Sequence, residues 1–143
     1  MSTDPDVNEF TILDDKRAII LTLCSNFLAN KLDELYVESS FTSTDLLLLL
    51  DDLMTELFQL ILNQIKQLNS ELGEYPRARS CISMVIANLK NSWDKGLERI
   101  ANKIVRSQMN DKIILQTFNQ IEKFQKNQVT TIFYSLKKCL EKI

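Results

Sequence analysis

The chain has 143 residues and a net charge of −2, and its 45% hydrophobic and 25% charged residues are typical of one globular domain. Two glycines and two prolines are too few for the tight turns of a β-sandwich or barrel, and for a glycine-rich phosphate loop. The absence of histidine excludes every catalytic or metal site that needs an imidazole.

The first ten residues, MSTDPDVNEF, are polar and acidic, and they lack the basic and apolar regions of a secretory signal. We expect residues 1–10 to be disordered and residues 11–143 to form a single helical-bundle domain. Apolar residues then recur at helical spacing over residues 12–36, which predicts the first helix. A cluster of Ser and Thr between positions 39 and 44 competes for backbone hydrogen bonds and predicts a loop.

The second predicted helix covers residues 45–72 and is apolar over a wide arc. Such a helix needs neighbours on more than one side, so we expect it to be the central helix of the domain. It contains five consecutive leucines at positions 46–50, but Asp51 and Asp52 follow at once. Because a membrane span needs about 20 apolar residues, this segment is predicted to be a core helix.

Two further helices are predicted over residues 76–109 and 111–143. Gly96 interrupts the cleanest apolar stripe of the chain at a cost of about 1 kcal/mol relative to Ala, so we expect a kink or a close helix crossing there. The polar residues 125–128 interrupt the last helix, which predicts a bend or a protrusion. No segment alternates with a period of two, and the connections are short. The sequence therefore predicts an all-α, antiparallel four-helix bundle with up-down-up-down topology and long helices.

The three cysteines, Cys24, Cys81 and Cys139, lie among apolar residues at helical spacing and show no spacing typical of a zinc site. We expect them to be buried, reduced thiols that pack as small hydrophobes, which favours a reducing intracellular compartment, the cytoplasm or nucleus. Asp51, Asp52 and Glu56 form the densest acidic group on a helix. They are interpreted as a solvated face in preference to a weak magnesium site, and no metal or cofactor is predicted.

Charge is divided unevenly along the chain. Residues 1–74 carry 4 basic and 14 acidic side chains, whereas residues 75–143 carry 13 basic and 5 acidic ones. Arg99, Lys103 and Arg106 are spaced so that they share one helix face and form a basic ridge. This ridge either complements the acidic half within the molecule, or is solvated, or contacts an acidic protein, nucleic-acid phosphates or an anionic membrane.

We expect partner binding to involve the basic ridge together with aromatic and basic residues of the last two predicted helices. Trp93 is expected to be a core anchor that becomes an interface residue only if it is exposed. Phe124 is either a core residue or a stacking surface. The candidate set is Arg99, Lys103, Arg106, Trp93, Phe124 and Lys126.

The first function hypothesis is a non-catalytic interaction module, a small helical adaptor or subunit that docks on another protein. Catalytic motifs are absent, and the apolar surface predicted for the second and fourth helices exceeds what one four-helix core needs. A chain with divided charge also favours oriented pairing with a complementary surface. We therefore expect protein partners, with a homo-oligomer as an alternative assembly, and no enzymatic activity.

The second hypothesis is a regulator of the Bcl-2 kind, of cellular or viral origin, in which a helical bundle captures an amphipathic partner helix in a groove. Residues 91–100, NSWDKGLERI, differ from the Asn-Trp-Gly-Arg core of that family. Here Asp94 and Lys95 stand between Trp93 and Gly96. The segment therefore assigns the chain to no family.

The third hypothesis is a binder of nucleic acid or of anionic membranes that uses the basic half. Its binding would weaken steeply with salt. The overall pI near 5.2 speaks against strong nucleic-acid binding, because non-specific affinity comes from neutralising phosphates.

Overall fold

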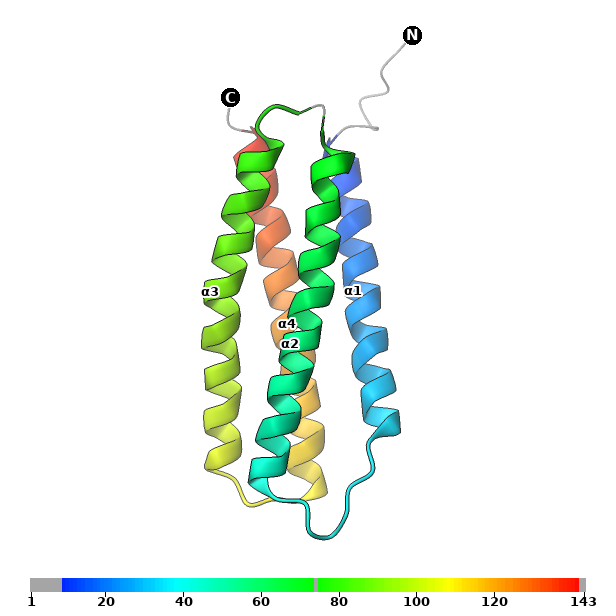
Figure 1. Cartoon of the computed structure of the whole chain (residues 1–143), viewed down its shortest axis with the longest axis vertical. Coiled ribbons are helices and arrows are strands. Elements are labelled where there is room, and N and C mark those ends of the chain that lie inside the picture. The colour runs from blue at the N-terminus through cyan, green and yellow to red at the C-terminus, as the bar shows by residue number, and fades with distance from the viewer. Residues whose placement is uncertain (1–8, 74, 142–143) are drawn as a thin grey trace.

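A computed structural model describes residues 9–73 and 75–141 of the chain (Figure 1). These residues form four α-helices and no strand, which confirms the predicted all-α four-helix bundle. The helices are α1 (Glu9–Glu34), α2 (Ser43–Glu71), α3 (Ala78–Val105) and α4 (Asp111–Glu141). The disorder expected at the N-terminus falls mostly on residues 1–8, which lie outside the described ranges, whereas residues 9 and 10 already belong to α1.

Consecutive helices run in opposite directions, as their order of colours shows in Figure 1. Contacts between side chains fix the register of α1 against α2. Lys16 Nζ lies 2.7 Å from Glu71 Oε1, and Lys31 Nζ lies 3.8 Å from Glu56 Oε2. Fifteen residues forward along α1 therefore match fifteen residues backward along α2, the relation that an antiparallel pair requires.

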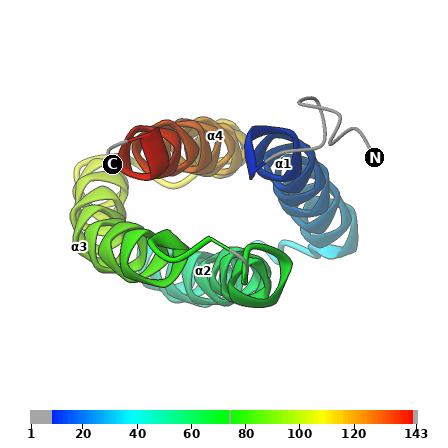
Figure 2. The same cartoon turned by 90° about the horizontal axis from the view of Figure 1, so that it is seen from above.

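The helices form a ring in chain order, as the view from above shows (Figure 2). Each helix packs against its two neighbours, and α2 also contacts α4 across the bundle, whereas α1 and α3 do not meet in the described part of the chain. Helix α2 thus contacts all three other helices, in agreement with the central place predicted for it, but α4 shares that place.

The core follows from the spacing of apolar residues in each helix. In α2 the buried residues follow helical spacing, with steps of three or four positions apart from the adjacent Leu53 and Met54: Leu46, Leu50, Leu53, Met54, Leu57, Ile61, Ile65 and Leu68. The helix begins at a capping box, in which Asp45 N donates to Thr42 Oγ1 and Thr42 N donates to Asp45 Oδ2. Among the described helices, none combines the length and apolar content that crossing a membrane requires.

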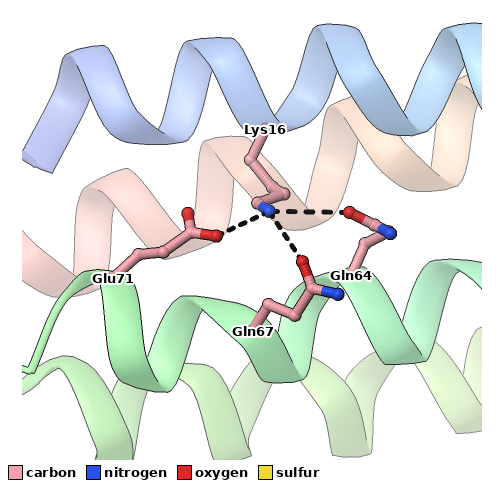
Figure 3. A network of polar contacts seen from close by, with 4 residues as sticks. All are labelled: Lys16, Gln64, Gln67 and Glu71. Carbon is pink, nitrogen blue, oxygen red and sulfur yellow. Dashed lines mark hydrogen bonds and ion pairs between the residues drawn. The ribbon is translucent and has the colours of Figure 1, made fainter.

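A polar network around the buried Lys16 joins α1 to α2 near the end of the bundle where α2 ends (Figure 3). The side chain of Lys16 is only 7% exposed, and besides its ion pair with Glu71 its Nζ donates to Gln67 Oε1 at 3.2 Å and to Gln64 Oε1 at 3.5 Å. Three acceptors on one face of α2 thus compensate the cost of burying the ammonium group.

The expectation that residues 125–128 bend or protrude is wrong at Gln125. This side chain is fully buried, and α4 continues through it as an unbroken helix. Ile121, Gln125 and Val129 are four residues apart and all buried, so helical geometry carries Gln125 inward whatever its polarity. Neither polar atom of its side chain has a hydrogen-bond partner among the described residues.

The expectation of three reduced thiols is wrong for two of them. Cys81 and Cys139 form a disulfide with a Cα–Cα distance of 5.7 Å, and Cys24 is a free, buried thiol. The two bonded cysteines are 58 residues apart in sequence, so only the packing of α3 on α4 brings them together. The sequence favours a reducing compartment only because all three thiols are expected to be unpaired. The disulfide removes that argument.

Candidate functional site

Most cations of α3 and α4 are not neutralised by the acidic half of the molecule. Among the ion pairs in the described ranges, one joins the two halves, between Lys137 Nζ and Asp14 Oδ1 at 2.7 Å. No cation within the described helix α3 lies within ion-pairing distance of a carboxylate. One interpretation of the basic ridge is that it complements the acidic half within the molecule. No ion pair at Arg99 or Lys103 in the described structure supports this interpretation.

The seam between α3 and α4 has a regular antiparallel register. Fifteen residues separate Cys81 from Gly96 along α3, and fifteen separate Phe124 from Cys139 along α4. Cys81 is bonded to Cys139, and the Phe124 ring lies against Gly96 so closely that a Cβ on Gly96 would overlap the ring. A side chain of α4 therefore fills the space at Gly96, and α3 is helical on both sides of it. The kink or close helix crossing expected at Gly96 stays a prediction.

Trp93 is buried, as expected for a core anchor, so the exposure on which its partner-binding role depended is not present. Its side chain is 3% exposed and its Nε1 donates to the Met54 carbonyl of α2 at 2.9 Å. The Trp93 ring lies between Phe58 of α2 and Phe124 of α4, with ring centroids 5.9 and 5.1 Å away. The row of three aromatic rings thus crosses from one flank of α3 to the other.

A shallow hollow of about 200 Å³, which we call the α3–α4 groove, is lined by residues of both helices, Gly96 among them. Its deeper part is apolar, because Gly96 and Ile100 are buried and Phe124 is half-buried. Its rim is cationic and polar. The lining residues are Gly96, Arg99, Ile100, Lys103, Gln120, Lys123, Phe124 and Asn127.

The groove brings together three of the residues predicted from sequence, Arg99, Lys103 and Phe124. Arg106 is the exposed C-cap of α3 and does not line the groove. Lys126 lies on another side of α4, where its Nζ is 3.2 Å from Glu122 Oε1, the atom that also accepts a hydrogen bond from Ser25 of α1. Neither residue therefore shares a site with the other three.

Sequence reasoning missed Gln120, Lys123 and Asn127, which line the α4 wall of the groove. Their spacing of three, four and seven residues places them on one helix face. Many other polar residues of α4 have the same spacing, so the spacing alone does not single these three out. Gly96 is the signal that could have found them. The packing partner of Gly96 on α4, which is Phe124, determines which face of α4 lies next to Arg99. No local pattern names that partner.

A second hollow of about 210 Å³, the α2–α3 groove, lies on the other flank of α3. Met54, Phe58, Trp93 and Leu97 form its apolar part. Its polar lining residues are Asp51, Thr55, Lys90 and Asp94. The two grooves therefore share the aromatic row but differ in charge, since carboxylates edge this one and none lines the other.

The remaining clusters offer no evident chemistry. No three Cys, Asp or Glu side chains in the described residues are grouped as a metal would require, and Glu56 faces Lys31. Burial and, to a lesser extent, the nearby Glu122 carboxylate together raise the pKa of the Cys24 thiol from its ordinary 9.0 to about 12. This thiol is therefore protonated at neutral pH and is a poor nucleophile.

Comparisons with protein-family models, with curated proteins and with solved structures found no match to this chain. The site residues therefore rest on the geometry of the chain itself.

Proposed function

We propose that the protein is a non-catalytic interaction module that docks another protein on the α3–α4 groove. The observation that carries the proposal is the grouping of Arg99, Lys103 and Lys123, none of them paired with a carboxylate in the described structure, around an apolar hollow. An apolar centre with a charged rim is the usual anatomy of a protein-binding surface. Cations on such a rim steer and orient an acidic partner.

Photocrosslinking tests this proposal with one residue inside the groove and one outside it. A benzoylphenylalanine placed at Asn127, which is exposed and lines the groove, should form an adduct with a discrete partner protein in cells that make this chain. The same group at Asn26, which is exposed on α1, should not form that adduct.

Charge reversal then shows whether the groove itself is recognised. R99E combined with K103E should remove the Asn127 adduct. The matched control is R79E combined with K112E, which makes the same change of charge at exposed positions that do not line the groove. An adduct that survives R99E/K103E, or no adduct from Asn127 at all, would contradict the proposal.

A second candidate function is capture of an amphipathic helix in the α2–α3 groove, as a regulator of the Bcl-2 kind would do. The apolar lining of Met54, Phe58, Trp93 and Leu97 favours it. Titration with helical peptides of the BH3 type, followed through Trp93 fluorescence, tests it. No binding at tens of micromolar would end this alternative.

A further inference from the structure

The dimensions of the α3–α4 groove limit what fits in it. On α3 its lining runs from Gly96 to Lys103, and on α4 from Gln120 to Asn127. Each wall covers seven residue steps, which is about 10 Å of helix at 1.5 Å per residue. This length matches about two turns of a partner helix.

The placement of charge and apolar surface in the groove defines the chemistry of the occupant. Arg99 and Lys103 are one turn apart on the α3 wall, and Lys123 stands on the α4 wall. The half-buried Phe124 ring and Ile100 supply the apolar lining of the same groove. An occupant that satisfies all of these groups has a central apolar side chain with carboxylates about one turn to either side.

We propose, on the basis of the docking function above, that the groove binds an acidic amphipathic segment of a partner protein about two helical turns long. Its apolar side chain lies on Phe124 and Ile100, and its carboxylates pair with Arg99, Lys103 and Lys123. The amides of Gln120 and Asn127 lie on the same wall as Lys123 and can donate to the same carboxylates or to the partner backbone.

The distribution of charge in the whole chain favours such a segment over a nucleic acid. A polyanion gains affinity from many phosphate contacts. Residues 1–74 carry 14 acidic against 4 basic side chains, and this half of the chain contains α1 and α2 of the same bundle. A long polyanion bound along α3 and α4 would therefore meet repulsion from the other half, whereas a short acidic segment meets only the local cations.

Fluorescence polarisation with designed probes tests this inference. The main probe is a labelled helical peptide of about twelve residues, with Glu residues flanking Leu and Phe on one face. A second peptide replaces the Leu and Phe by Ser, and the other probes are an oligothymidylate of similar length and vesicles containing phosphatidylserine. The first peptide should bind most tightly, and its binding should weaken as salt rises.

Variants of the groove then locate the binding. R99E combined with K123E should weaken the first peptide by tenfold or more, whereas R79E combined with K112E should change it by less than about twofold. All four positions are exposed, and circular dichroism confirms that each variant is folded. Equal weakening by the two pairs, equal binding of the Ser peptide, or tighter binding of the oligothymidylate or the vesicles would overturn the inference.

The two proposals can fail separately. If the Asn127 crosslink depends on Arg99 and Lys103 but the acidic peptide does not bind, the docking function stands and the acidic occupant is wrong. If the crosslink is also absent, both are wrong.

Discussion

At the scale of single residues, the contact between Gly96 and Phe124 is the tightest packing feature described between α3 and α4. The Phe124 ring occupies the space where any other residue at position 96 would place its Cβ, and it also contacts the Trp93 ring in a tilted arrangement. The price of Gly in a helix, about 1 kcal/mol, is offset by this packing. The same contact forms the apolar part of the α3–α4 groove.

Gly96→Ala should lower the free energy of unfolding by about 1–2 kcal/mol, although Ala favours helix, because the Phe124 ring must leave Trp93. Urea unfolding measures the loss, and Trp93 fluorescence reports the displaced ring. Ser83→Ala, at an exposed position of α3, is the control and should change stability by less than about 0.5 kcal/mol. A Gly96→Ala variant as stable as the control would show that the ring moves aside freely.

Cys24 should make the free energy of unfolding decrease at high pH. Its thiol is protonated in both folded and unfolded chains below its ordinary pKa of 9.0, and in the folded chain the pKa is raised to about 12. Between these values it ionises only when unfolded, so the free energy of unfolding should fall by about 1.4 kcal/mol per pH unit. Chemical unfolding of the wild type and of Cys24→Ala at pH 8, as the reference, and at pH 10 and 11 measures this slope, which the variant should lack.

At the scale of helices, the sequence patterns predicted the position of each helix and its buried face. The apolar stripe of α2 is local, so it is readable without the fold. The capping box of Thr42 and Asp45 is local too, but it was not predicted from the sequence. The groove was only half predicted. Arg99 and Lys103 follow from spacing within one helix, but Lys123 belongs to the site through the register of α4 against α3.

Substitution of Lys16 measures how much its polar contacts with α2 contribute to the packing of α1 on α2. Lys16→Ala should lower the free energy of unfolding by about 2 kcal/mol, because Glu71, Gln64 and Gln67 lose their shared donor and the lysine stem loses its packing. Lys66→Ala removes an exposed lysine of α2 and should be nearly neutral. Equal losses in thermal or urea unfolding would mean that the network adds nothing.

At the scale of the whole molecule, the disulfide ties the start of α3 to the end of α4. Reduction, or Cys139→Ser, should lower the free energy of unfolding by about 4 kcal/mol, because the bond closes a loop spanning 58 residues. The thiol count checks the bond itself. The unreduced protein should show one reactive thiol in denaturant, from Cys24, and almost none when folded. Three reactive thiols before reduction would contradict the bond.

The sequence by itself determined that the chain forms long helices with one apolar face each, because helical periodicity and capping are properties of neighbouring residues. It also showed the divided charge. Only the tertiary structure decided which helices are neighbours and in which register they pack. That register joined Cys81 to Cys139 and placed Lys123 in the same groove as Arg99. Each of these outcomes depends on residues far apart in the chain, which leave no local pattern to read.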